Sequence, residues 1–264
     1  MKRCVANVAR RACSSFERAD GSPIDITGSM MSGSVGGPAS AAFESRWDTI
    51  FAQKKQTRDV TNIFSQWCDD NRDEGMHRNH QSAVDAILER PVAELSARDE
   101  RFSVVDAGCG NGWLARQISQ LDECESACGI DGSRRMIAKA EQLTREDSET
   151  DGGSSQPTFV HAALEEWRPV KPVTFVFSME VLYYHRDPVK LLTQFRSWLA
   201  DDGVFASGVD FFGEHAASHT WPAATGLPMT LLSEAEWHSA LVDAGFMDVS
   251  TNRIGNTLAL YGRR

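Results

Sequence analysis

The apolar residues in the first part of the chain follow a helical spacing. Between residues 43 and 95 they recur every three or four positions, as at Val60, Ile63 and Trp67, and this spacing predicts two or three amphipathic helices. A polar stretch at residues 68–81, CDDNRDEGMHRNHQ, lacks that pattern and predicts a break between helices. Residues 43–95 are therefore predicted to form a helical cap.

From residue 96 to residue 264 short apolar runs alternate with helical stretches, which is typical of a parallel α/β sheet. A loop is predicted at residues 147–157, and a Gly-Asn pair at residues 255–256 is typical of a hairpin. The predicted strands are 101–108, 125–131, 158–164, 173–180, 203–212, 247–254 and 257–263, and the predicted helices are 112–121, 133–146, 187–199 and 233–245. Residues 96–264 are thus predicted to form the core domain.

The first 42 residues differ from the rest in composition. Residues 1–18 hold several arginines and a single acid, Glu17, and residues 21–42 are rich in Gly, Ser and Pro. Such a segment is predicted to be a disordered tail or a mitochondrial targeting segment. Both readings stay open, so the predicted location is the cytoplasm, with the mitochondrion as the alternative.

The charge of the chain restricts its partners. The formal net charge is -10 at pH 7, which disfavours broad contact with nucleic acid phosphates or anionic lipid. No apolar run approaches the roughly 20 residues that span a bilayer, so a soluble protein is expected. The six cysteines show no CxxC spacing, and neither a zinc site nor a disulfide framework is indicated.

One short stretch, VVDAGCGNGW at residues 104–113, carries the clearest chemical signal. A predicted strand ends in Asp106, and Gly108, Gly110 and Gly112 follow at alternate positions before a helix. Glycines let a ligand approach the backbone, and a helix N-terminus offers unpaired N–H groups. The next strand ends in Asp131, where an acidic side chain can accept both ribose hydroxyls of an adenosine. The pair of features predicts a nucleotide-cofactor site.

The spacing of the glycines separates the possible cofactors. A dinucleotide fingerprint beginning at Gly108 would require glycine at the position of Trp113, and no GxxxxGK[ST] phosphate loop is present. The remaining DxGxGxG pattern, with Asp131 downstream, resembles that of the class I S-adenosylmethionine-dependent methyltransferases over residues 102–263. The resemblance implies an α/β, Rossmann-like, seven-stranded and mostly parallel sheet with helices on both faces, preceded here by the helical cap.

The resemblance also implies which residues bind S-adenosylmethionine. Asp106 and the backbone of the glycine turn would face its methionine part, Asp131 its ribose, and the start of the next helix its adenine. The family often has Asp-Ala after the third strand where this chain has Ala162-Ala163, so only a backbone N–H remains there. The implied cofactor-binding residues are Asp106, Gly108, Cys109, Gly110, Gly112, Asp131, Gly132, Ser133, Met136, Ala163, Ser178 and Glu180.

Structural roles are the alternative for several of these residues. Asp106 and Asp131 could instead cap helices, while Met136 and Trp113 could pack in the core. Trp47 and Trp67 in the cap could belong either to a pocket wall or to packing, and Arg78 or His80 could pair with the carboxylate of the cofactor or lie in solvent.

The methyl acceptor is expected beyond the fourth and fifth strands, at the open carboxyl edge of the sheet. A histidine there could take a proton from an acceptor. His185, Tyr184 and His219 are the predicted catalytic residues, with Tyr183, Asp210, His215 and Trp221 as further candidates. The acidic residues that a catechol-type metal site requires are not recognisable in the sequence, so no metal is predicted.

The predicted function is methyl transfer to an oxygen, nitrogen or sulfur atom of a small polar metabolite. The absence of NPPY or DPPY after the fourth strand disfavours methylation of exocyclic base amines or glutamine amides. No nucleic acid or membrane partner is predicted, and the oligomeric state is left open. The alternatives are a non-catalytic cofactor-binding module that docks to a partner, and a protein or tRNA methyltransferase.

Overall fold

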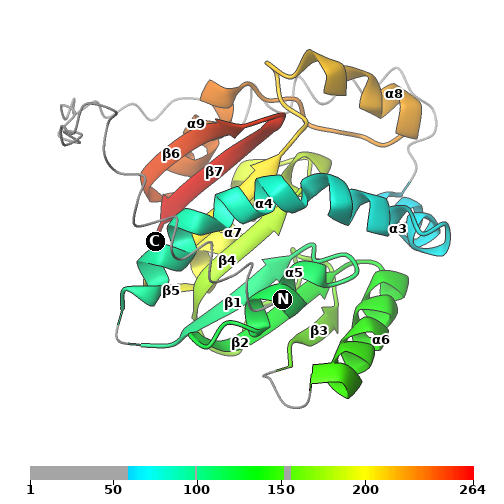
Figure 1. The fold of residues 1–264 in the computed structure, drawn as a ribbon. Helices are drawn as coiled ribbons and strands as arrows, with labels where there is room; N and C mark the ends of the chain where they lie inside the picture. Colours follow the sequence, from blue (N-terminus) through cyan, green and yellow to red (C-terminus); the bar gives the residue numbers. More distant parts are fainter. Residues whose placement is uncertain (1–58, 99, 152–155) are drawn as a thin grey trace, which may run out of the picture.

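The computed structural model describes residues 59–98, 100–151 and 156–264 (Figure 1). The segment 1–42, and Trp47 in the predicted cap, lie outside the described residues. The strands form one sheet in the order β3-β2-β1-β4-β5-β7-β6. The bounds are β1 Phe102–Ala107, β2 Cys124–Asp131, β3 Thr158–His161, β4 Val173–Met179, β5 Leu199–Val209, β6 Met247–Ile254 and β7 Thr257–Arg263.

The direction of the strands confirms the predicted fold. β1 pairs in parallel with β2 and β4, and β5 pairs in parallel with β4, whereas β7 is antiparallel to both β5 and β6. The chain runs outward from β1 to β3 and then returns to form β4 on the other side of β1. In open α/β sheets this reversal leaves a crevice at the carboxyl ends of the two central strands. Asp106 near the end of β1 and Met179 at the end of β4 lie at that edge.

Helices cover both faces of the sheet because buried side chains alternate along the strands. Val104 of β1 and Phe177 of β4 pack with apolar residues of α4 and α5, and Val105 and Val176 pack with residues of α7 and α9. The helices are α3 Val60–Asp69, α4 Arg72–Ser96, α5 Trp113–Ser119, α6 Arg134–Asp151, α7 Pro188–Trp198, α8 Trp221–Thr225 and α9 Glu234–Asp243, with short 3-10 turns η1 Leu182–Tyr184 and η2 Ala216–Thr220.

The predicted break at residues 68–81 is wrong for most of its length. The chain leaves helical geometry only around Asn71, which has a φ of 54°, and α4 then continues from Arg72 through Pro91 to Ser96 (Figure 1). A proline inside a helix frees the carbonyl four residues earlier. Here that carbonyl belongs to Ile87, and it accepts a hydrogen bond of 3.3 Å from the hydroxyl of Tyr261 on β7.

Two other boundaries follow from local chemistry. α6 extends to Asp151, into the segment predicted as a loop, since no helix breaker precedes Gly152. α9 begins at a capping box, in which Ser233 and Glu236 each accept from the other's backbone N–H, as the predicted N-cap requires. Within the described ranges, no helix is both long and apolar enough to cross a membrane.

Candidate active site

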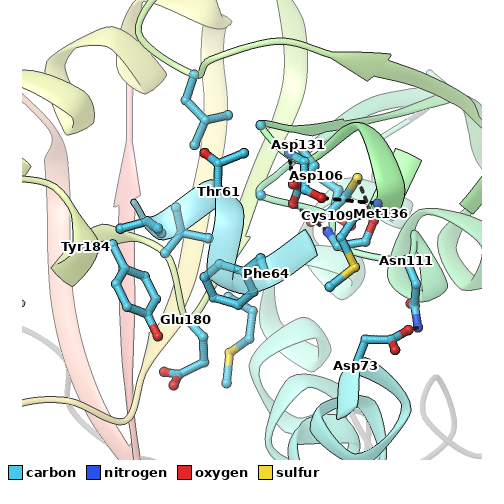
Figure 2. A pocket seen from close by; sticks show the side chains of 18 of the residues that line it. Thr61, Phe64, Asp73, Asp106, Cys109, Asn111, Asp131, Met136, Glu180 and Tyr184 are labelled. Carbon is cyan, nitrogen blue, oxygen red and sulfur yellow. Dashed lines mark hydrogen bonds between the residues drawn. The ribbon is translucent and has the colours of Figure 1, made fainter. Parts of the chain in front are cut away.

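A cavity of about 920 Å³ lies at the carboxyl ends of β1, β2 and β4. Helices α3 and α4 close one side of it, and the segment after β4 closes another (Figure 2). Its size is in the range of a cofactor pocket with room for a second small ligand. The predicted site residues that line it are Asp106, Gly108, Cys109, Gly110, Asp131, Gly132, Ser133, Met136, Ala163, Glu180, Tyr184 and His185.

The three glycines of the turn after β1 have left-handed backbone angles, with φ of 80° at Gly108, 53° at Gly110 and 72° at Gly112. A Cβ atom at Gly108 would lie 2.3 Å from Val181, and one at Gly112 would lie 2.4 Å from Phe159. Those two positions are thus closed by the protein itself. At Gly110 a Cβ would meet no atom within 4 Å, and it would point into open space at the cavity wall.

Asp131 ends β2 and holds the glycine turn in place. Its Oδ2 accepts a hydrogen bond of 3.0 Å from the backbone N–H of Gly110, and its Oδ1 accepts one of 2.7 Å from the N–H of Ser133. Burial raises the pKa of this carboxyl, while the two backbone hydrogen bonds lower it in part. Each carboxylate oxygen keeps a further lone pair, so the group can accept hydroxyls of a ligand in the cavity. Its hold on the backbone of the turn and its predicted ribose role are therefore compatible.

Asp106 is buried beside Asp131 in the same wall (Figure 2). Within the described part of the chain its Oδ2 has no hydrogen-bond partner, an arrangement that costs free energy unless a ligand or a proton satisfies it. Burial and the nearby carboxylate of Asp131 raise the pKa of Asp106 to about 7. An unpaired carboxyl oxygen next to an open glycine turn fits a ligand with a cationic group, such as the ammonium of S-adenosylmethionine.

Two predicted cofactor contacts lie away from the cavity lining. The hydroxyl of Ser178 is fully buried and donates a hydrogen bond of 2.8 Å to the carbonyl of Ala107, which joins β4 to β1. Gly112 begins α5 and faces Phe159 rather than open space. Each is enclosed by neighbouring protein atoms, and its predicted contact with the cofactor stays a prediction.

Glu180 follows β4 and lies at the other end of the cavity (Figure 2). Its φ is 59°, which is uncommon for a residue other than glycine. Its Oε2 accepts a hydrogen bond of 2.7 Å from the hydroxyl of Tyr183, and its Oε1 accepts one of 2.5 Å from the backbone N–H of Asp210. Burial and the charge of Asp210 raise the pKa of Glu180 to about 8.

His80 of α4 completes a cluster with Glu180 and Asp210. Its Nε2 lies 3.4 Å from Oδ2 of Asp210 and 4.0 Å from Oε2 of Glu180. Burial alone would lower the pKa of His80, but the hydrogen bond to Asp210 and the charge of Glu180 raise it. A set of acidic metal ligands is not recognisable in the sequence. In the structure, however, one possible ligand atom from each of the three side chains lies within 4.8 Å of the other two. The predicted absence of a metal stays a prediction.

The predicted catalytic residues separate into two groups. Tyr184 and His185 line the cavity, and Nδ1 of His185 lies 2.8 Å from Oε1 of Glu165. His219 does not line it: its ring is exposed, and its Nε2 lies 3.2 Å from the carbonyl of Phe212. The catalytic role of His219 therefore stays a prediction that the cavity lining does not support.

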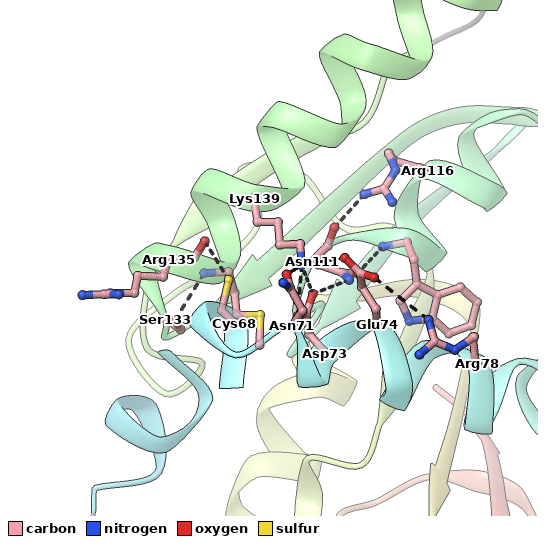
Figure 3. Close-up of polar contacts among 12 residues, drawn as sticks. Cys68, Asn71, Asp73, Glu74, Arg78, Asn111, Arg116, Ser133, Arg135 and Lys139 are labelled. Carbon is pink, nitrogen blue, oxygen red and sulfur yellow. Dashed lines mark hydrogen bonds and ion pairs between the residues drawn. The ribbon is translucent and has the colours of Figure 1, made fainter. Parts of the chain in front are cut away.

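Four residues of α4 line the cavity with a helical spacing: Asp73, Met76, His77 and His80. Of these, only His80 is named as a possible cofactor contact from the sequence. Asp73 is buried and accepts a hydrogen bond of 2.7 Å from the side chain of Asn111 in the glycine turn (Figure 3). Lys139 of α6 lies 2.9 Å from the same carboxylate. The ring of His77 stacks on Trp113 at 4.3 Å. These contacts join the helical cap to the glycine turn. Arg78 is exposed and faces Glu74 instead.

Because the pKa of Glu180 is raised, we predict that the free energy of unfolding depends on pH. A carboxyl whose pKa is higher in the folded state stabilises the fold below its unfolded pKa, and this contribution is lost as the pH rises through the folded value. For the pKa of Glu180 these values are the ordinary 4.5 and, in the fold, about 8. The free energy of unfolding of the wild type, measured in urea without ligand, should therefore fall relative to that of Glu180→Gln between these pH values. A constant difference between the two proteins would contradict the burial of this carboxyl.

The fold and the cavity define a class of protein: an α/β enzyme domain that binds a nucleoside cofactor at the reversal of strand order. A family profile described as "Methyltransferase domain" matches residues 76–251. The chain belongs to this methyltransferase family.

Among similar curated proteins is a tRNA U34 carboxymethyltransferase of Aeromonas salmonicida, which is 28% identical over 49% of this chain and 38% of its own length. A trans-aconitate 2-methyltransferase of Klebsiella pneumoniae is 31% identical over 46% of each chain. The chain thus spans less than half the length of these relatives.

Among solved structures, a Haloferax volcanii methyltransferase in complex with the Trm112 methyltransferase activator is similar with a TM-score of 0.65 and 25% identity, over 79% of this chain and 99% of that one. A magnesium protoporphyrin IX methyltransferase from Synechocystis with bound S-adenosylhomocysteine has a TM-score of 0.55 and 22% identity, over 85% and 94%. The second likeness concerns the fold alone.

Proposed function

We propose that the protein transfers a methyl group from S-adenosylmethionine to an oxygen, nitrogen or sulfur atom of a small polar metabolite. The observation that carries this proposal is one cavity that joins two differently built ends. Asp106, Asp131 and the open Gly110 form one end, and Glu180, Tyr184 and His185 lie toward the other (Figure 2). A methyl donor and an acceptor could therefore meet within it.

The roles of the residues follow from their surroundings. S-adenosylmethionine, when bound, supplies an already activated methyl group. Asp131 would accept the ribose hydroxyls, and the unpaired oxygen of Asp106 would accept from the ammonium. α3 and α4 would exclude water from the transfer. His185, paired with Glu165, and Tyr184 are the groups proposed to orient the acceptor or to move its proton.

The charge of the lining supports a small acceptor that is not an anion. Among the residues that the structure describes, the lining includes several carboxylates but no lysine or arginine: the acidic residues are Asp59, Asp73, Asp106, Asp131, Glu165 and Glu180. trans-Aconitate, named for one relative, carries carboxylates, and tRNA, named for another, carries phosphates. Both would need cationic partners, which this wall does not provide.

A tRNA or protein acceptor is the second candidate, because the names of a relative and of a structural neighbour's partner point that way. A cofactor-binding module without catalysis is the third. A cytoplasmic location, with the mitochondrion as the alternative, and the lack of a nucleic acid partner remain proposals from the sequence.

A transfer assay distinguishes these candidates. The protein is incubated with S-adenosylmethionine labelled in its methyl group and with separate small-molecule, RNA and protein fractions of a cell extract. We expect label to enter the small-molecule fraction only, and mass spectrometry then identifies the product. Label in RNA or protein would support the second candidate, and cofactor binding by calorimetry without any transfer would support the third.

A further inference from the structure

We propose that the acceptor is a cationic amine, that its nitrogen receives the methyl group, and that Glu180 together with the rings of Phe64 and Tyr184 holds it. This inference rests on the function proposed above and specifies the acceptor of the same cavity. Figure 2 shows the three side chains gathered on one side, apart from Asp106 and Asp131.

The first support is the position of Glu180 relative to the charged groups around it. His80 is the basic group beside it, but Nε2 of His80 lies closer to Asp210, at 3.4 Å, than to Glu180, at 4.0 Å. The hydroxyl of Thr257 donates a further hydrogen bond of 2.6 Å to Asp210. Asp210 therefore takes up the charge of His80. Glu180 is left with two neutral donors, a phenol and a backbone N–H, and its carboxylate lacks a full counter-charge.

The second support is independent and comes from the aromatic rings. Phe64 of α3 and Tyr184 of η1 both line the cavity, and their centroids are 5.4 Å apart with an interplanar angle of 88°. Two rings set edge to face beside a carboxylate form a partial cage. Aromatic faces attract ammonium and methylated ammonium groups, whereas they offer no ligand atoms to a metal ion.

The position of Glu180 is fixed rather than adaptable. Both of its oxygens are held by donors from different elements, Tyr183 of η1 and the N–H that follows β5. A pre-oriented carboxylate in a site of low polarity binds an ammonium more strongly than a solvated one does. The arrangement also leaves a lone pair on each oxygen for a donor in the cavity.

The same carboxylate can prepare the amine for transfer. One proton passes from the bound ammonium to Glu180, which leaves the nitrogen with a free electron pair. That pair forms the new N–C bond while the C–S bond of the sulfonium breaks and its electrons return to sulfur. The methylated nitrogen is again a cation, and the proton on Glu180 passes to solvent after release.

Three probes of nearly equal shape test the recognition: trimethylammonium, tert-butanol and pivalate, each titrated by NMR into protein saturated with S-adenosylhomocysteine. We expect trimethylammonium to bind about tenfold or more tightly than the other two. Glu180→Gln should remove this preference. If Glu180→Gln does not fold, Phe64→Leu serves in its place and should weaken trimethylammonium alone. Glu125→Gln, an exposed acid on β2, is the matched control and should change nothing. Equal binding of the three probes would overturn the proposal.

The labelled product of the transfer assay gives the second readout. We expect it to be retained by a cation exchanger and to carry the methyl group on nitrogen. A methyl ester, an ether or a thioether would overturn the amine proposal but leave methyl transfer intact. Transfer that requires a divalent ion and stops with EDTA would also overturn it, in favour of a metal at His80, Glu180 and Asp210. Failure of S-adenosylhomocysteine to bind would instead refute the proposed function itself.

Discussion

Gly110→Val is expected to abolish binding of S-adenosylmethionine while the protein still folds. A side chain at residue 110 meets no protein atom within 4 Å, so its methyl groups would occupy the open space of the cavity wall where the cofactor is placed. We expect the dissociation constant from calorimetry to rise by about two orders of magnitude or more, which corresponds to about 2.7 kcal/mol.

Gly255→Val is the matched control for this variant. Gly255 has a φ of 61° and equally open surroundings, but it lies in the hairpin between β6 and β7. The two variants therefore share the strain that a β-branched residue suffers at positive φ, and both should lose stability. Only Gly110→Val should lose the cofactor. Retained binding in Gly110→Val would show that the cofactor does not lie against this turn.

Asp131→Ala is expected to have the second large effect. The substitution removes the acceptors proposed for both ribose hydroxyls, and hydrogen bonds to a charged group contribute roughly 1.5 to 3 kcal/mol each. It also frees the N–H groups of Gly110 and Ser133, which the carboxylate holds. Calorimetry with S-adenosylhomocysteine should show a loss of affinity of about tenfold or more for each lost hydrogen bond.

The control for Asp131→Ala is Asp187→Ala. Asp187 caps α7 by accepting from the N–H of Lys190 at 3.0 Å, and it is exposed and outside the cavity lining. Loss of this cap should lower stability by about 1 kcal/mol and leave cofactor affinity unchanged. Equal affinity of Asp131→Ala and wild type would restrict Asp131 to holding the backbone of the turn.

The cofactor end could be predicted from the sequence because its residues lie at fixed places in a regular pattern. Asp106 and Asp131 come near or at the ends of neighbouring parallel strands, and Gly108 and Gly110 come in the turn between a strand and a helix. Parallel pairing brings these positions to one edge of the sheet, whatever the rest of the chain does. The same regularity gave the order of strands and helices after residue 96.

The acceptor end could not be predicted in this way, since it joins elements far apart in the chain. Nothing local relates His80 on α4 to Glu180 after β4 or to Asp210 after β5. A signal did exist within the polar stretch: Asp73, Met76, His77 and His80 keep a helical spacing even though they are not apolar. The helix also continues through Pro91, because the hydroxyl of Tyr261 on the last strand satisfies the carbonyl of Ile87.

We propose that the cofactor lies against the backbone at Gly110 with its ribose at Asp131. The most direct test is a crystal structure of the protein with S-adenosylhomocysteine bound. We expect the ribose hydroxyls to lie within hydrogen-bond distance of the Asp131 carboxylate. We also expect the backbone at Gly110 to contact the ligand with no side chain between them. Density for the ligand elsewhere, or a ribose whose hydroxyls face away from Asp131, would contradict the proposed cofactor site.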